Sequence, residues 1–390
     1  MSKYDFDKIT DRKGTNSLKW NVSDGVLPMW VADMDFAVCP DIQDAIKARA
    51  QHPIFGYSVE PAEWSKAYID WWGERHDTVI KKDMLLFSTG VIPTISTTVR
   101  RIAAPGEGVI VMTPVYNVFF NCINNSERRV VENPLKYDAE SMRYDIDFED
   151  LEAKAALPDT KLLLLCNPQN PAGRIWTREE LARIGDICKA NGVMVLSDEI
   201  HCDLTLPGVD YVPFMSASDV CKDISITAIA PSKTFNIAGL QSSAVVVPNR
   251  QLRRTIWNGL NADEVGEGNC FACDAAIAAF TKGGQWLDEL REYIAQNKRI
   301  AVDYINNNVT KLRATVSDAT YLLWVDTTAL TPNSDKLAVH LKDEAKLFVT
   351  RGGAYGGNGE GFLRVNLACP RSVLMDGLER LKRGVDSYNE

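Results

Sequence analysis

The sequence lacks the features that direct a protein to nucleic acid, to a membrane or out of the cell. Its 43 Lys and Arg residues are outnumbered by 52 Asp and Glu residues, and a net charge of −9 is unlike that of nucleic-acid or membrane-surface proteins. Apolar runs such as residues 162–166 fall far short of the roughly 20 residues that a membrane helix needs. Residues 1–11 have several charged side chains and no apolar core, so we expect no signal peptide. We therefore expect a cytoplasmic protein with neither a nucleic-acid nor a membrane partner.

The cysteine, histidine and glycine patterns exclude several kinds of site. Nine cysteines are an odd number spread over 390 residues, unlike a secreted disulfide scaffold. The lone pair Cys270 and Cys273 has no second pair or nearby histidine, so a packed helix is a better interpretation than zinc. Residues 352–361 are glycine-rich but precede a strand-like run, so they are no dinucleotide-binding fingerprint. The histidines show no metal-ligand spacing, and we expect no metal: His52, His76, His201 and His340.

What the sequence does contain is a series of short apolar runs. They are apolar on both faces, which is typical of buried strands in a parallel sheet rather than of half-exposed hairpins. Helical segments separate many of them, and the clearest begins at Thr177, with Glu180 completing a capping box, and ends near Asn191 and Gly192. Alternating strands and helices predict an α/β domain. The runs are residues 85–88, 109–112, 162–166, 193–197, 224–229 and 244–247.

The pattern changes at Trp286, which suggests a second domain. A long helical stretch to about residue 308 is followed by strand-like runs at 321–326, 348–350 and 362–368. Helical segments lie near residues 334–345 and at the C-terminal end. A chain of 390 residues exceeds the usual single domain. We predict a large α/β domain over residues 51–285 and a smaller α+β domain formed by residues 1–50 and 286–390.

Polar residues follow three of the predicted strands where those strands end. Asn170 follows the run 162–166, Asp198 follows 193–197 and Lys233 follows 224–229. In open α/β sheets, ligands bind beyond the carboxyl ends of the strands. An amide, a carboxylate and an amine would therefore converge on one crevice. Taken singly, each has an ordinary explanation as a turn, a helix cap or a solvated loop residue.

Four separated motifs carry a resemblance that extends over essentially the whole chain. They are the NPQNPAG stretch from Asn167, SDEIH from Ser197, PSKTFN from Pro231 and FLRVN from Phe362. In this order the set resembles the aminotransferase superfamily of pyridoxal-phosphate (PLP) enzymes, fold type I. The stretches WVADMDF at residues 30–36 and FGYS at 55–58 resemble a narrower branch, the bacterial C–S lyases or cystathionine β-lyases of the MalY and PatB type.

The resemblance implies an aspartate aminotransferase-like fold of PLP-dependent transferases. This fold has a mostly parallel central sheet with helices on both faces, plus a smaller α+β domain. The resemblance also implies that Lys233 holds the cofactor as a Schiff base, which requires an amine that burial helps to deprotonate. Asp198 would keep the pyridine nitrogen protonated, so that the ring accepts electrons. Asn170 would donate to the phenolic oxygen, and Tyr116 would stack on the ring.

The remaining implied contacts concern the phosphate, the substrate and a second subunit. The backbone amides of Gly90, Val91 and Ile92, at the start of a helix, would bind the phosphate. Ser232 would donate a further hydrogen bond to it from its hydroxyl. Tyr57 would reach the phosphate from the other chain of a homodimer. Arg364 would clamp the α-carboxylate of an amino-acid substrate, and Ala32 would line the substrate site. His201 would contact the cofactor.

Three positions depart from the common aminotransferase pattern. His201 stands where many relatives carry a tyrosine, as it does in the C–S lyase branch. Gln241 stands where an arginine often holds the phosphate, and Ala230 stands where a serine is common. The phosphate site is therefore less cationic than in many aminotransferases.

The sequence supports three functional hypotheses. The first is a PLP-dependent β-lyase that cleaves the C–S bond of cystathionine or a related S-substituted cysteine to a thiol, pyruvate and ammonia. The second is an aminotransferase acting on an unidentified amino acid. The third is a regulatory protein that retains the fold and uses it to bind another protein, although the presence of Lys233 and Asp198 argues against a loss of catalysis.

Overall fold

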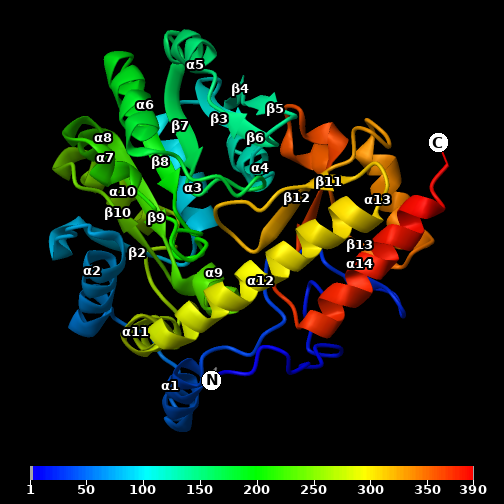
Figure 1. The fold of residues 1–390 in the computed structure, drawn as a ribbon. Helices are drawn as coiled ribbons and strands as arrows, with labels where there is room; N and C mark the ends of the chain where they lie inside the picture. The colour runs from blue at the N-terminus through cyan, green and yellow to red at the C-terminus, as the bar shows by residue number, and fades with distance from the viewer. Residues whose placement is uncertain (1–2, 390) are drawn as a thin grey trace.

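A seven-stranded sheet organises the larger part of the molecule in this computed structural model, which describes residues 3–389. Figure 1 shows the sheet between two layers of helices, with the long helix α12 (Gly284–Asn308) crossing beside it. The strands, in spatial order, are β2 (Leu85–Ser88), β10 (Ser243–Val246), β9 (Ser225–Ile229), β8 (Met194–Asp198), β7 (Thr160–Cys166), β3 (Gly108–Thr113) and β4 (Arg129–Pro134).

Strand β7 shows why the sheet is covered on both faces. Leu162 and Leu164 pack with one group of helices: α3 (Val91–Ile102), α4 (Val118–Asn124) and α10 (Arg250–Ala262). Leu163 and Leu165 pack with the other group, which includes α5 (Phe148–Ala155) and α6 (Arg178–Ala190). Successive side chains of a strand point to opposite faces, so a strand covered on both sides is apolar throughout. The predicted fold class is confirmed.

Two strands of the seven-stranded sheet differ from the sequence prediction. Strand β10, predicted to be parallel, pairs antiparallel with both β2 and β9. The segment between β9 and β10 holds only the short helices α9 (Pro231–Thr234) and η2 (Ala238–Leu240), whereas parallel strands are usually joined by a full crossover helix on one face of the sheet. Strand β4 has no counterpart in the prediction because it lies at the sheet edge, where buried and exposed residues alternate and no continuous apolar run forms.

The predicted helix after β7 is confirmed as α6. Thr177 Oγ1 accepts from the amide of Glu180 at 3.2 Å, and the Glu180 carboxylate accepts from the amide of Thr177 at 2.8 Å. This reciprocal capping box satisfies two amides that the first helical turn leaves free. Helices α7 (Phe214–Ala217) and α8 (Asp219–Ile224) follow on the same face, where Cys221 joins the α5 and α6 core.

A second, four-stranded sheet packs against the C-terminal half of α12. Its strands are antiparallel, in the order β11 (Arg313–Ala314), β12 (Leu322–Asp326), β15 (Phe362–Asn366) and β14 (Thr350–Arg351). Helices α13 (Ser334–Asp343) and α14 (Arg371–Asp386) share its core. The N-terminal segment contributes β1 (Leu27–Pro28), which pairs with β13 (Leu347–Phe348). Short turns at η3 (Gly352–Tyr355) and η4 (Gly359–Gly361) precede β15.

Three helices form an aromatic-rich core at the β2 edge. Helix α11 (Ala272–Lys282) packs against both α1 (Pro40–Gln51) and α2 (Ala62–His76), near the short helix η1 (Lys82–Met84). Cys270 and Cys273 lie at the start of α11, and the described residues contain no disulfide. The two-stranded sheet of β5 (Lys136–Asp138) and β6 (Arg143–Asp145) lies outside the main sheet.

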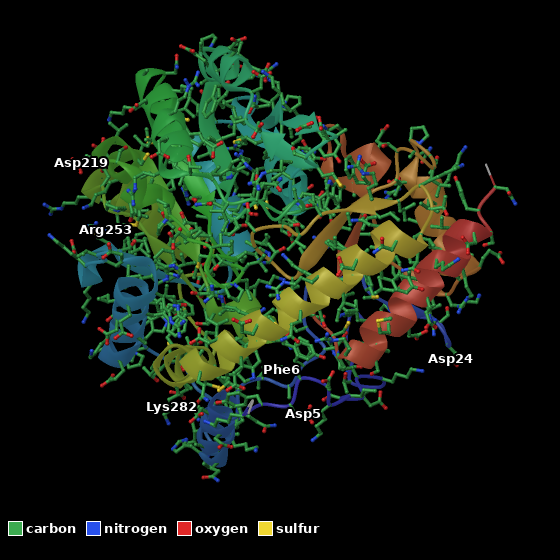
Figure 2. The ribbon with its side chains drawn as sticks, viewed as in Figure 1. Asp5, Phe6, Asp24, Asp219, Arg253 and Lys282 are labelled. Atoms are coloured by element: carbon green, nitrogen blue, oxygen red, sulfur yellow. The ribbon has the colours of Figure 1, made fainter. Side chains whose placement is uncertain are left out.

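Across residues 3–389, no helix is long and apolar enough to cross a bilayer. Figure 2 shows charged side chains such as Asp219, Arg253 and Lys282 at the surface.

Candidate cofactor and substrate site

A cavity of about 200 Å³ lies at the carboxyl ends of the central strands. Strands β7, β8 and β9 lead into it, and the start of α3 forms its opposite wall. Ten of the twelve residues predicted from sequence line this cavity: Ala32, Gly90, Val91, Ile92, Tyr116, Asn170, Asp198, His201, Ser232 and Lys233. Arg364 contacts it through Asn170, while Tyr57 lies fully exposed on a surface loop.

Lys233 enters the cavity from α9, the single helical turn that follows β9. Its Nζ donates a hydrogen bond to the carbonyl oxygen of Ala32 at 2.5 Å. Burial lowers the pKa of Lys233 to about 8, and the nearby Arg364 guanidinium contributes to this lowering. A neutral amine is the reactive form for bonding to a carbonyl, so this environment favours covalent chemistry close to neutral pH.

Asp198 ends β8 and is almost completely buried. Burial raises its pKa to about 6, although a hydrogen bond from the amide of Ile200 at 3.2 Å and the charge of Lys233 act in the opposite direction. The carboxylate therefore has few charged or hydrogen-bonding partners to compensate for its desolvation. A protonated ring nitrogen in the cavity would supply such a partner.

The start of α3 offers an anion site. Gly90 is the N-cap residue, no side chain caps the helix, and Gly90, Val91 and Ile92 all line the cavity. Amides at a helix start bind phosphate well because the helix dipole adds to their partial charge. Ser232 lines the same cavity and adds a hydroxyl, while Gln241 also lines it in a left-handed conformation with φ of 53°.

His201 is buried beside this site and stays neutral. Burial lowers its pKa to about 3, with the charges of Lys233 and Arg364 acting in the same direction. Its Nδ1 has no hydrogen-bond partner among the residues that the structure describes. Its ring meets Tyr321 edge to face at 5.9 Å, and Tyr321 Oη donates to the carbonyl oxygen of Ala32 at 2.9 Å. A buried nitrogen without a partner marks a place where a ligand atom would be stabilising.

Arg364 lies in the centre of β15, where the smaller sheet faces the cavity. It donates from Nη1 to Asn170 Oδ1 at 3.1 Å and from Nη2 to the carbonyl oxygen of Trp30 at 3.0 Å. Its guanidinium lies over the ring of Tyr355, 5.1 Å from the ring centre. Within residues 3–389 no carboxylate forms an ion pair with it, and its Nε has no partner. A buried, unneutralised guanidinium favours binding of a substrate carboxylate.

Several residues near the site were not found from the sequence. Asn366 Nδ2 donates to the carbonyl oxygens of Val31 and Asp33 at 2.6 Å each, which holds the segment that carries Ala32. Asn366 follows Arg364 by two residues, so the period of a strand places both on one face, and this signal was available. Tyr321 and Tyr355 had no such signal, because only the packed fold brings them to Arg364.

The residues present fit PLP. The amine of Lys233, the under-compensated carboxylate of Asp198 and the uncapped helix start at Gly90 match the aldehyde, ring nitrogen and phosphate of that molecule in chemical type. The unpartnered Nδ1 of His201 adds a further polar atom beside them. The fold and this set of residues define a PLP-dependent enzyme of fold type I. The chain belongs to the aminotransferase class I and II family, whose pattern matches residues 25–381.

Relatives within this family share the whole length of the chain. Cystathionine beta-lyase PatB of Bacillus subtilis is 42% identical over 384 residues, covering 97% of this chain and 98% of that protein. Protein MalY of Escherichia coli is 34% identical over 386 residues, covering 97% and 98%. Among solved structures, cystalysin from Treponema denticola, which contains PLP, is 35% identical with a TM-score of 0.94 over 98% of this chain and 99% of that one. A PLP-bound C–S lyase from Staphylococcus hominis is 32% identical with a TM-score of 0.92 over 99% and 100%.

Proposed function

We propose that this protein is a PLP-dependent β-lyase that cleaves the C–S bond of cystathionine or a related S-substituted cysteine. One water molecule is consumed, and the products are a thiol, pyruvate and ammonia. The observation that carries the proposal is the pairing of buried Lys233 with buried Asp198 in one cavity, in a chain whose full-length relatives are a cystathionine β-lyase and C–S lyases. We expect the enzyme to work in the cytoplasm.

Each end of PLP has a set of residues suited to hold it. Lys233 would bind the aldehyde carbon, Asp198 the ring nitrogen and Asn170 the phenolic oxygen, while Tyr116 would cover the ring and His201 would contact it. The phosphate would lie near Ser232, at the start of α3, which is formed by Gly90, Val91 and Ile92. When bound, PLP supplies an electron sink for the negative charge that forms when a proton leaves the substrate α-carbon.

The side chains of this chain orient the substrate and move its proton. Arg364 would bind the α-carboxylate through its two terminal nitrogens, and Ala32 would line the side of the substrate. Lys233 would then take the proton from the α-carbon, because an amine with a pKa of about 8 exchanges protons readily near neutral pH. Burial of the cavity excludes water, which strengthens each of these electrostatic contacts.

The reaction type is tested by product analysis with the purified protein. Incubation with cystathionine should release pyruvate and a thiol in equal amounts, and S-substituted cysteines should react likewise. A parallel incubation of an amino acid with a keto acid measures amino-group transfer, which we expect to be slow. Brisk amino-group transfer without pyruvate release would show that the protein is an aminotransferase rather than a lyase. The absence of both activities would favour a regulatory protein.

We propose further that the enzyme is a homodimer with shared sites. The loop between α1 and α2 exposes four large apolar or aromatic side chains close together in sequence: Ile54, Phe55, Tyr57 and Val59. A second copy covering this loop would bury them, and Tyr57 would then reach the phosphate of the neighbouring chain. Hybrids of inactive Lys233→Ala and impaired Tyr57→Phe subunits should regain activity through one intact site. A monomer by light scattering, or hybrids no better than their parents, would contradict the proposal.

A further inference from the structure

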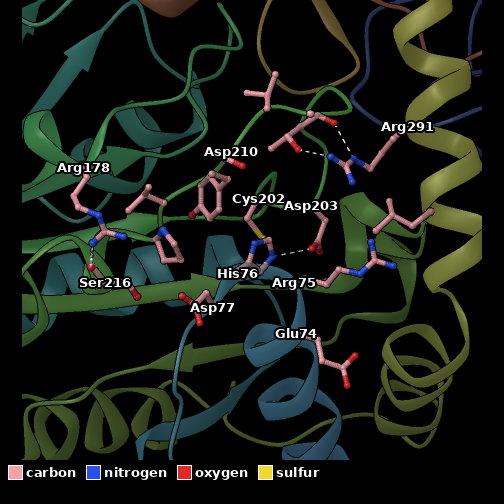
Figure 3. Close-up of a pocket in the computed structure, with 17 residues that line it drawn as sticks. Glu74, Arg75, His76, Asp77, Arg178, Cys202, Asp203, Asp210, Ser216 and Arg291 are labelled. Atoms are coloured by element: carbon pink, nitrogen blue, oxygen red, sulfur yellow. Dashed lines mark hydrogen bonds and ion pairs between the residues drawn. The ribbon is translucent and has the colours of Figure 1, made fainter.

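A second buried carboxylate lies behind the segment that carries Lys233. Asp203 lines a separate cavity of about 600 Å³, together with His76 and Cys202 (Figure 3). Its Oδ1 accepts hydrogen bonds from Trp71 Nε1 and His76 Nε2, both at 2.9 Å. Its Oδ2 accepts a hydrogen bond from Thr234 Oγ1 at 3.0 Å. Three side-chain donors from two distant parts of the chain therefore converge on one carboxylate.

Thr234 connects this network to the cofactor site, because it is the residue after Lys233. Both belong to the four-residue helix α9, which is too short to hold its own orientation through helical hydrogen bonds. From the other side, Asn236 accepts from the amide of Met34 and donates to the carbonyl oxygens of Met34 and Phe36, each at 3.0 Å. The lysine segment is thus fixed from two directions, by Asn236 and by the bond from Thr234 to Asp203.

The charge of Asp203 strengthens its hydrogen bonds with Thr234, His76 and Trp71, which together form the anchor of the lysine segment. Burial by itself would raise the pKa of Asp203, but the hydrogen bonds from His76, Trp71 and Thr234 outweigh burial and lower it. Because Asp203 has only acceptor atoms, Nε2 of His76 carries the hydrogen in this contact. The anchor is therefore a carboxylate that is ionised near neutral pH, and charge-assisted hydrogen bonds are shorter and stronger than neutral ones.

We propose that Asp203 is a positioning residue for Lys233, acting through the hydroxyl of Thr234 and held in place by the hydrogen bonds from His76 and Trp71. The inference rests on the proposed role of Lys233, but it concerns the placement of the amine rather than the reaction that follows. Trp71 extends the same link, since its ring also meets Phe235 at 5.7 Å. Helix α2 thereby supports the lysine segment at two consecutive residues, Thr234 and Phe235.

A metal site is the rival explanation for this cluster. The ligand atoms of His76, Cys202 and Asp203 lie within 4.8 Å of one another. Burial raises the pKa of Cys202 well above its ordinary value, whereas a metal requires the thiolate. The Asp203 oxygens already accept three hydrogen bonds, and a metal would displace the one from His76. The contacts therefore favour a hydrogen-bonded anchor.

The test compares holoenzyme variants that differ by one hydroxyl. Thr234→Val removes the bond to Asp203, and Thr234→Ser keeps it. Thr97→Val is the matched control, because Thr97 is equally buried and also bonds a carboxylate, that of Asp263, and neither residue lines the cavity that contains Lys233. The main readout is the pH midpoint at which the absorbance of the bound cofactor changes, a measurement that needs no substrate. Pyruvate release supplies kcat and KM.

We expect Thr234→Val to shift the midpoint by about 0.5 pH units or more, since one pH unit corresponds to about 1.36 kcal/mol between protonation states. We expect kcat to fall about tenfold or more with little change in KM, because misplacement of a reacting group by about 1 Å costs up to about 100-fold. Thr234→Ser should restore both values, and Thr97→Val should change neither. Asp203→Asn, a second variant of similar shape, should shift the midpoint in the same direction.

Equal midpoints for Thr234→Val, Thr97→Val and the wild type would overturn the proposal. Zinc present in the purified wild type at one atom per chain, and lost in Cys202→Ser, would overturn it as well. A wild type that binds PLP but releases no pyruvate would contradict the proposed reaction alone. In that case the midpoint shifts would still decide the role of Asp203.

Discussion

Asp198 and Asp203 are buried carboxylates five residues apart whose pKa values move in opposite directions. Asp198 ends β8 in front of Lys233, accepts a backbone hydrogen bond at 3.2 Å, and has its pKa raised by burial to about 6. Asp203 lies behind the same lysine segment, where burial acts likewise but three side-chain hydrogen bonds lower its pKa. The two carboxylates are similarly buried, yet their pKa values shift in opposite directions. The cause is the number of hydrogen-bond donors that each carboxylate has.

The difference extends to the two cavities around these carboxylates. In front of Lys233, buried polar atoms lack partners within the described chain, including Nδ1 of His201 and Nε of Arg364. Behind it, Asp203 is paired with His76 (Figure 3), and Arg75 of the same cavity is paired with Asp288. Unpartnered buried groups cost free energy unless a ligand completes them. The front cavity is thus suited to bind a ligand, and the rear one to hold the fold.

The largest effect should come from Lys233→Ala, which removes the only amine of the front cavity among the described residues. We expect lyase activity to fall at least about 1,000-fold, because both covalent attachment and proton transfer depend on this amine. The wild type should be yellow and absorb in the Schiff-base region, and the variant should lose that band. Borohydride-trappable cofactor at the wild-type level in Lys233→Ala would refute the assignment.

Arg364→Ala should weaken the reaction next most strongly. Removing the guanidinium leaves a buried substrate carboxylate unpaired, which costs roughly 2–5 kcal/mol in kcat/KM. Steady-state kinetics with cystathionine measures this loss, and the bound-cofactor spectrum should remain. Arg351→Ala is the control, since Arg351 lies on the neighbouring strand but is exposed and paired with Asp335. Similar losses in the two variants would assign the effect to general charge rather than to a carboxylate clamp.

Asp203→Asn should destabilise the protein freed of cofactor. The pKa of Asp203 is lower in the folded than in the unfolded state, so its ionised form contributes stability above pH 3.8. That contribution disappears as pH falls through the lowered pKa. Breaking such a buried pair costs about 3 kcal/mol or more at pH 7, measured as the free energy of unfolding in denaturant. A variant as stable as the wild type at pH 7 would remove the basis for the anchor.

Asp198→Asn should do the opposite in the same cofactor-free protein. A folded-state pKa of about 6 against an ordinary 3.8 means that stability is lost as pH rises between these values. Removing the charge should therefore raise the free energy of unfolding at pH 7 by about 3 kcal/mol. The folded and unfolded pKa values differ by about two, and each pKa unit is worth about 1.36 kcal/mol. Near pH 3.5 the variant and the wild type should be equally stable. Destabilisation at pH 7 would show that Asp198 is well compensated without a ligand.

The sequence predicted the residues of the cavity in front of Lys233 better than those of the cavity behind it. Asn170, Asp198 and Lys233 follow strands directly, so the rule that ligands bind at strand ends brings them together. The contact between His76 and Asp203 joins residues 127 apart and carries no local pattern, so only the packing of α2 reveals it. The antiparallel direction of β10 was also hidden, because its buried residues read the same in either direction.

Lys298 sharpens the question of which lysine carries the cofactor. It is fully buried in α12, burial lowers its pKa to about 7, and it donates to Ser317 and to the carbonyl oxygen of Ala319 at 2.6 Å. Its pKa is lowered at least as far as that of Lys233, yet its partners are neutral oxygens and it does not line the front cavity. Geometry rather than pKa is therefore the reason to propose Lys233 as the residue that holds the cofactor.

The most direct measurement is to reduce the PLP-bound protein with borohydride, digest it and locate the added mass by mass spectrometry. The account predicts that the modified peptide contains Pro231 to Asn236, with the cofactor on Lys233. Reduction at one cofactor per chain should accompany complete loss of lyase activity. Modification of Lys298 or of surface lysines, with Lys233 unmodified, would contradict the assignment of the front cavity as the cofactor site.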